Sequence, residues 1–279
     1  MFDTTNNSKS KKNSIMKKLT LLFVLLVVIT SCKEKTETPT VNYEEQNLDV
    51  TTSIYPEDIT KVFDAHGGLD NWKQMRTLEF SMEKPDGLEI TTTDLRERYS
   101  LIEMPKHTIG FDGESVWMKS KDKTVYKGNP KFYYNLMFYF YAMPFILADD
   151  GIKYTDAEPL VFEGKSYPGI KISYEAGVGE SPDDEYVMYY DSETNKMTWL
   201  GYTVTYFSKE KSEKWSFINY SDWQEVEGLL MPKTLSWYNV ENNLPTTKRN
   251  DVEFSHVMMT TDKMSLKMYM MPDDAEVVQ

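Results

Sequence analysis

Polar and apolar positions alternate with a period of two in about ten short stretches between residues 77 and 257, as in strands with one packed and one solvated face. The clearest stretch runs from Thr77 to Glu83, where Leu78, Phe80 and Met82 alternate with other residues. Short connections such as Asp86-Gly87 favour hairpins, so we expect an antiparallel meander. Strands are predicted at residues 77–83, 88–102, 106–111, 114–119, 165–175, 185–190, 197–207, 214–223, 234–238 and 251–257.

Helical periodicity appears just before the first predicted strand. From Ile59 to His66 the inward positions recur at i, i+3, i+4 and i+7, which predicts a short amphipathic helix starting at Pro56. Gly67-Gly68 is typical of a helix C-terminus. Residues 69–75 predict a second short helix turn.

A charge-free segment, Phe132 to Ala148, interrupts the strand pattern. Asn129 and Pro130 predict the N-cap and first residue of a helix, and Pro144 should break that helix in two. The segment is apolar on all sides, so it should be covered on most of them. Two interpretations stay open: a core helix filling a curved sheet, or the wall of a cavity for an apolar ligand. In the second, the ligand contacts would be Leu136, Phe140, Met143 and Phe145.

The N-terminal region predicts export and lipidation. Lys17-Lys18 precede an uncharged apolar run at residues 19–29, which has the length of a signal peptide core and is short for a spanning helix. Residues 29–32 resemble the lipobox of bacterial lipoproteins. This resemblance implies cleavage before Cys32 and attachment of diacylglycerol and further acyl chains, such as palmitate, at that residue. Met16 is a plausible true start.

The expected domain organisation has three parts. Residues 1–31 form the export segment, residues 32–52 a polar, lipidated tether, and residues 53–279 a single domain. Lys33, in place of an aspartate, favours the outer membrane over the inner membrane. Whether the domain faces the periplasm or the cell surface stays open, since Glu34 and Glu37 resemble acidic residues that accompany surface export.

The charge of the chain argues against nucleic acid as a partner. The net charge is −13, and residues 1–31 contain five lysines and one aspartate, which leaves about −17 on the rest. Phosphate binding needs clustered lysine and arginine residues. The membrane is therefore expected as a partner through Cys32 alone, with an apolar small molecule or lipid as a further candidate.

No recognisable catalytic or metal motif stands out. The three histidines are His66, His107 and His256, and neither a G-x-S-x-G elbow nor an H-E-x-x-H pair accompanies them. His66 is better explained as a hydrogen-bond donor or cation at a helix C-terminus. Residues 177–182 and the acidic run 181–185 read as loops. We expect no cofactor and no metal, and an enzyme, for instance a hydrolase using carboxylates, is the third choice.

Five segments together look like an uncharacterised family of bacterial lipoproteins with a domain of unknown function. They are Ala65 to Trp72, Thr108 to Gly113, Phe132 to Ala148, Gly177 to Glu185 and Trp199 to Tyr202. The arrangement is also similar to the LolA/LolB/LppX-type half-barrel, which shelters acyl chains. This resemblance implies an α+β fold, with a curved antiparallel sheet of about ten strands and helices packed on its concave face.

Two functions from different classes follow. The first is a lipid-anchored outer-membrane lipoprotein that binds an apolar ligand or acyl chains between sheet and helices, without catalysis. The alternative is an envelope scaffold or interaction protein with a filled core. A cavity in the structure favours the first, and a solid core favours the second.

Overall fold

The computed structural model describes residues 54–174, 184–208 and 210–278. The expected export segment, Cys32, the tether and most of the predicted loops at 177–185 lie outside these residues. Within the described ranges, no helix is long and apolar enough to cross a membrane.

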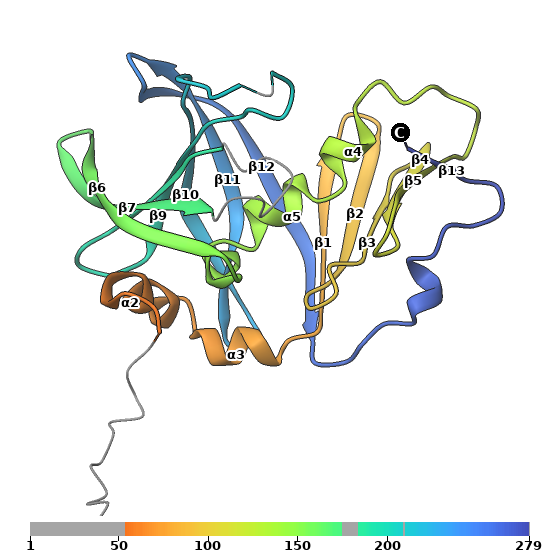
Figure 1. The fold of residues 1–279 in the computed structure, drawn as a ribbon, viewed down its shortest axis with the longest axis horizontal. Helices are drawn as coiled ribbons and strands as arrows, with labels where there is room; N and C mark the ends of the chain where they lie inside the picture. Colours follow the sequence, from red (N-terminus) through yellow and green to blue (C-terminus); the bar gives the residue numbers. More distant parts are fainter. Residues whose placement is uncertain (1–53, 175–183, 209, 279) are drawn as a thin grey trace, which may run out of the picture. The chain divides into compact units, whose positions relative to one another are not determined.

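The described residues form one open antiparallel sheet of 13 strands (Figure 1). Its order is β13-β5-β4-β3-β2-β1-β12-β11-β10-β9-β8-β7-β6, so β13 and β6 are the two edges. The strands are β1 (Thr77–Lys84), β2 (Gly87–Asp94), β3 (Ser100–Glu103), β4 (His107–Phe111), β5 (Val116–Ser120), β6 (Ile152–Phe162), β7 (Lys165–Tyr174), β8 (Tyr186–Tyr190), β9 (Met197–Tyr202), β10 (Ser216–Val226), β11 (Leu229–Glu241), β12 (Leu244–Thr260) and β13 (Glu276–Val277).

The expected antiparallel sheet is confirmed, but the expected number of about ten strands is wrong. The stretch 88–102 is two strands because Asp94 ends β2. Its carboxylate accepts hydrogen bonds from the backbone N–H groups of Arg96 and Glu97, at 3.0 Å each, and turns the chain. β6 was missed because its sequence, with three acidic or basic residues and Pro159, is that of an exposed edge strand. β13 has only two residues.

Few helices accompany the sheet: α2 (Glu57–Ala65), α3 (Leu69–Gln74), α4 (Pro130–Tyr133), α5 (Leu136–Tyr141), and the 3₁₀ turns η1 (Phe145–Ala148) and η2 (Leu266–Met268). The Asn129 side chain caps α4 by accepting from the Phe132 N–H at 3.1 Å, as the sequence predicts. The predicted break at Pro144 also occurs, between α5 and η1. A further break at Asn135 separates α4 from α5.

The core lies where the α5–η1 segment meets the sheet, which curves around α5 in Figure 1. The Tyr141 ring packs on Phe80 of β1 and Phe254 of β12, with centroids 4.5 and 4.4 Å away. The Tyr220 hydroxyl of β10 donates to the Phe140 carbonyl at 2.8 Å. The face of the sheet that carries Phe80 and Tyr220 is called the inner face below.

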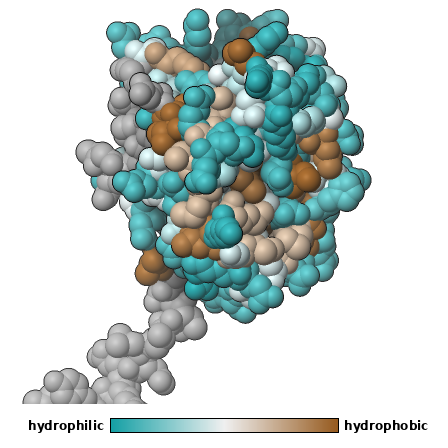
Figure 2. All heavy atoms as spheres, turned by 90° about the vertical axis from the view of Figure 1, so that its right-hand side faces the viewer, coloured by the Kyte–Doolittle hydropathy of each residue, from teal (hydrophilic) through white to brown (hydrophobic). Residues whose placement is uncertain are grey.

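The opposite, outer face of β3 to β5 is covered by the C-terminal segment. The Trp117 indole N–H of β5 donates to the Tyr269 carbonyl at 2.9 Å. Gly110 of β4 leaves room for this indole, because a Cβ at that position would lie 2.2 Å from the Trp117 ring. On this side of the domain, apolar side chains reach the surface in separate groups among polar ones (Figure 2).

Candidate functional site

Three polar side chains of β2 point to the inner face. Glu89, Thr91 and Thr93 lie opposite Met82, Phe80 and Leu78 of β1, and directly opposite residues of an antiparallel pair share a face. All three are buried, with relative exposures of 4, 1 and 1%. This polar row therefore separates the apolar inner face of β1 from a second apolar cluster on β3 to β5, formed around Ile102, Ile109 and Val116.

Two hydroxyls of the polar row are unsatisfied. Thr91 Oγ1 and Thr93 Oγ1 are buried and have no hydrogen-bond partner among the described residues. Their neighbour Ser100, which lies opposite Thr93, donates to the Tyr134 carbonyl at 3.3 Å. Leaving a buried donor unpaired costs about 1–3 kcal/mol, so native proteins keep few such groups.

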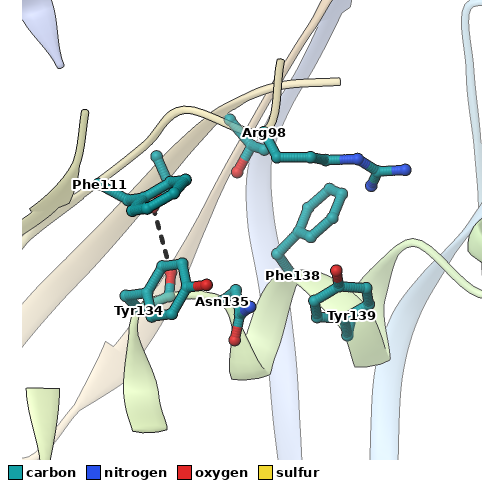
Figure 3. Close-up of a pocket in the computed structure, with 8 residues that line it drawn as sticks. Arg98, Phe111, Tyr134, Asn135, Phe138 and Tyr139 are labelled. Carbon is teal, nitrogen blue, oxygen red and sulfur yellow. Dashed lines mark hydrogen bonds between the residues drawn. The ribbon is translucent and has the colours of Figure 1, made fainter. Parts of the chain in front are cut away.

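A small hollow adjoins the end of the polar row (Figure 3). Its volume is about 40 Å³, which is room for a few water molecules, since roughly 10–15 Å³ of such space holds one. The sheet side contributes hydroxyls and an arginine, and the α4–α5 junction contributes mainly aromatic rings. The lining residues are Thr93, Arg98, Ser100, Phe111, Tyr134, Asn135, Phe138 and Tyr139.

Arg98 is held beside the hollow by two contacts. Its Nη2 donates to both carboxylate oxygens of Asp149, at 2.6 and 2.7 Å, and its guanidinium lies over the Phe138 ring, 5.2 Å from the centroid. Its Nη1 is buried and has no hydrogen-bond partner within the described part of the chain. Burial raises the pKa of the Asp149 carboxyl, and the Arg98 charge opposes that rise.

The other end of the polar row is closed by an aromatic hydroxyl. The Tyr133 hydroxyl of α4 donates to Glu89 Oε1 at 2.6 Å. Burial raises the pKa of the Glu89 carboxyl, and the Tyr133 bond partly offsets this rise. The polar row thus carries a satisfied acid at one end and unsatisfied donors at the end nearest the hollow.

None of the four residues expected to contact a ligand lines the hollow. Phe140, Met143 and Phe145 are buried in the main core, and Leu136 packs against that core. Phe140 contacts Tyr202 and Trp237 with ring centroids 5.1 and 5.9 Å away. The hollow is bounded instead by their α5 neighbours, among them Phe138 and Tyr139.

The histidines are not brought together. His66, at the end of α2, is fully buried, and its Nδ1 lies 2.7 Å from the Val62 carbonyl, which fits the predicted donor role. Burial lowers its pKa to about 4, so it is neutral rather than the alternative cation. His107 lies on β4 beside Thr124, and His256 is exposed on β12.

The described acids of the predicted 181–185 loop are engaged within the protein. Asp184 accepts hydrogen bonds from the Thr205 N–H and hydroxyl, and Glu185 pairs with Lys171 at 2.9 Å. In the described part of the chain, no three His, Cys, Asp or Glu residues are grouped as metal ligands would be.

Sequence reasoning missed the hydroxyls and the arginine around the hollow. A usable signal existed, because a tight turn after Lys84 fixes the pairing of β1 with β2. A two-residue turn pairs Met82 with Glu89, and paired residues of an antiparallel hairpin share a face. With Met82 inward, Glu89 is therefore inward as well. Arg98, by contrast, stands in a turn at φ 61°, and its contact with Asp149 has no local sequence signal.

Residues 109–253 match the sequence model of DUF6503, a family of unknown function. The match spans most of the segments on which the expected membership of an uncharacterised family rests, and it confirms that expectation. No curated protein matches the chain.

Solved structures with a similar chain path share little sequence. A DUF1329 family protein from Desulfovibrio piger has 10% identity and a TM-score of 0.43, over 73% of this chain and 93% of its own. A LolA superfamily protein from Nitrosomonas europaea has 7% identity and a TM-score of 0.42, over 71% and 89%. Lipoprotein LppX from Mycobacterium tuberculosis has 12% identity and a TM-score of 0.24, over 52% and 85%. Such values assign no function.

Proposed function

Since the chain belongs to DUF6503, a family of unknown function, we infer its role from its own residues and propose a non-enzymatic binding protein for an apolar or acyl-chain ligand. The ligand lies between the inner face of the sheet and the segment formed by α4, α5 and η1. In this proposal the protein is a lipoprotein of the outer membrane, anchored through Cys32.

One observation carries the proposal: a hollow with unsatisfied buried donors adjoins a charge-free aromatic segment on an open curved sheet. Buried polar groups without partners are expected where a ligand supplies the missing acceptor. The aromatic rings of Phe111, Tyr134 and Phe138 give the same hollow an apolar wall.

The size of the hollow limits how a ligand enters. At about 40 Å³ it takes one small polar group, so an acyl chain has to displace part of the α4–α5–η1 segment from the sheet. Helices α4 and α5 have only four and six residues and meet at a break, so either one can shift without unwinding a long helix. A chain that passes under α5 then contacts Leu136, Phe140, Met143 and Phe145.

The envelope location rests on the sequence before the domain. The pair Lys17-Lys18, the apolar run 19–29 and Cys32 support a cleaved and acylated N-terminus, and Lys33 supports the outer membrane. Mass spectrometry of the N-terminal peptide tests this directly. An acylated peptide beginning at Cys32 is expected, and an unmodified cysteine in an uncleaved chain contradicts the anchor.

The binding function is tested by native mass spectrometry of the mature lipoprotein. The protein is kept in detergent micelles, and the detergent is removed in the gas phase. The expected result is an added mass that denaturation removes and that lipid analysis identifies, on top of the covalent acyl chains. A protein without added mass, which also takes up nothing from a lipid extract, contradicts the proposal.

A second candidate is an envelope interaction protein with a filled core. The packing favours it directly, since Phe140, Met143 and Phe145 are buried in a continuous cluster with residues of β1 and of β7 to β12. The native mass spectra distinguish the two candidate functions, because a protein with a filled core retains no lipid.

A further inference from the structure

Arg98 lines the hollow, and its guanidinium carries a positive charge and a donor, Nη1, that has no partner among the described residues. From this geometry, and resting on the acyl-ligand function proposed above, we propose that Arg98 and Thr93 bind the carboxylate of a fatty-acid-type ligand. The ligand's single carboxylate occupies the hollow, and its apolar chain runs between α5 and the inner face of the sheet.

The choice of an anion follows from the donors. Arg98 Nη1 and Thr93 Oγ1 are both buried, both lack a partner among the described residues, and both residues line the hollow. A carboxylate accepts from both groups and leaves neither unsatisfied. A guanidinium nitrogen that has no partner is suited to a carboxylate, because hydrogen bonds between these two charged groups are charge-assisted.

Asp149 shows that the site tolerates a carboxylate, but it does not use the whole guanidinium. Both Asp149 oxygens accept from Nη2, so this internal carboxylate occupies one nitrogen and leaves Nη1. Asp149 also neutralises part of the Arg98 charge, so it competes with a ligand anion for that charge. Removing the Asp149 charge should therefore strengthen ligand binding, whereas removing Arg98 should weaken it.

The size and walls of the hollow favour a fatty acid over a phospholipid. A volume of about 40 Å³ suits a small group such as a carboxylate better than a bulkier substituted phosphate headgroup. The rings of Phe111, Tyr134 and Phe138 line the hollow with apolar surface, which fits the first methylenes of a chain (Figure 3).

The test is a competition between palmitic acid and hexadecanol, offered as an equimolar mixture to the mature lipoprotein at pH 8. Native mass spectrometry gives the ratio of the two bound ligands, and the shared chain length matches the apolar contacts that each can make with the protein. We expect palmitate to exceed hexadecanol by about tenfold, the order expected for a charge-assisted hydrogen bond. Equal binding of both overturns the carboxylate site while leaving acyl binding intact, and no binding of either overturns the proposed function itself.

Two variants separate charge recognition from structural damage. Arg98→Gln and Asp149→Asn break the same ion pair, so a structural effect moves both in the same direction. We expect Arg98→Gln to bring the bound ratio close to one, with hexadecanol still bound, and Asp149→Asn to raise the ratio above that of the natural protein. A preference that survives in Arg98→Gln, or one that falls in both variants, contradicts the proposal.

Thr93→Val provides a test that does not disturb the ion pair. The change removes a hydroxyl that has no partner, so the ligand-free protein should melt at a higher temperature while its preference for palmitate falls. An unchanged preference argues against this hydroxyl as a ligand donor. Finally, excess sodium acetate should fail to release palmitate, and release would assign the hollow to small carboxylates instead.

Discussion

Thr91 on β2 lies directly opposite Phe80 on β1, so a hydroxyl without a partner among the described residues sits beside a fully buried aromatic ring. Thr91→Val replaces that hydroxyl with a methyl group of nearly the same shape. We expect the free energy of unfolding to rise by about 1 kcal/mol, because the desolvated hydroxyl is no longer buried unpaired. Urea denaturation of the protein measures the change.

The neighbouring residue provides the matched control. Thr92 points to the other face of β2, where its hydroxyl donates to Glu79 Oε2 at 2.9 Å. Thr92→Val should lower the free energy of unfolding by about 1.5–3 kcal/mol, since it removes a bond to a charged acceptor. The opposite signs are the expected result, and a loss of stability in Thr91→Val shows that this hydroxyl is paired in solution.

The predictable part of the fold is the part with strong local signals. Leu78, Phe80 and Met82 gave the inner face of β1, and Asn129 and Pro144 gave the start and the break of the apolar segment. These residues act through side-chain alternation, capping and a missing N–H, which depend on the nearest neighbours in sequence.

Around the hollow the sequence pattern is misleading. In β2 the apolar Leu88 and Ile90 alternate with Glu89, Thr91 and Thr93, and hydrophobicity alone favours burying the first pair. The hairpin with β1 has the opposite effect. Because Met82 pairs with Glu89, the side chains of Glu89, Thr91 and Thr93 point to the inner face. Tertiary pairing overrides the local pattern here, which is often the case at functional sites.

The hollow itself has no signature in the sequence. It exists because the α4–α5 junction packs against β2 to β4 without filling the space between Arg98 and Tyr134. Its residues come from three separate stretches of the chain, so their proximity follows only from the folded arrangement.

The buried His66 predicts a loss of stability in mild acid. Burial, with a smaller contribution from the Lys196 charge, lowers its folded pKa to about 4, whereas an unfolded histidine titrates near 6.5. Between these values the unfolded chain binds a proton that the folded protein excludes. The stabilising contribution of His66 is therefore complete above pH 6.5 and is lost as the pH falls toward 4, by about 2 kcal/mol at pH 5.

The measurement compares free energies of unfolding at pH 7 and pH 5 in the natural protein and in His66→Gln. Glu89 and Asp149 have raised pKa values, so they oppose the effect in both proteins, and the difference between the proteins isolates His66. His256→Gln, a change at an exposed histidine, provides the matched control. Equal pH dependence in the natural protein and His66→Gln contradicts the prediction.

A change at Phe140 tests whether the α5 segment is packed firmly on the sheet or is easily displaced from it. Its ring contacts Tyr202 and Trp237, and its backbone carbonyl accepts from Tyr220. Phe140→Ala should therefore lower the free energy of unfolding by about 3–5 kcal/mol, through lost burial and the cavity that remains. Tyr139→Ala changes the next residue of the same helix, which is 38% exposed, and should cost far less.

The Phe140→Ala variant also bears on ligand binding, because the chain of an acyl ligand has to pass under α5. Adding Leu136→Ala to Phe140→Ala trims the surface that the chain would contact, so retained lipid in native mass spectra should decrease while the protein stays folded. A thermal melt of the double variant supplies the folding control, because it shows whether the protein is folded at the temperature of the binding assay. If Phe140→Ala costs less than about 1 kcal/mol, the segment is loosely packed even without ligand, because a firmly buried ring of this size cannot be removed so cheaply.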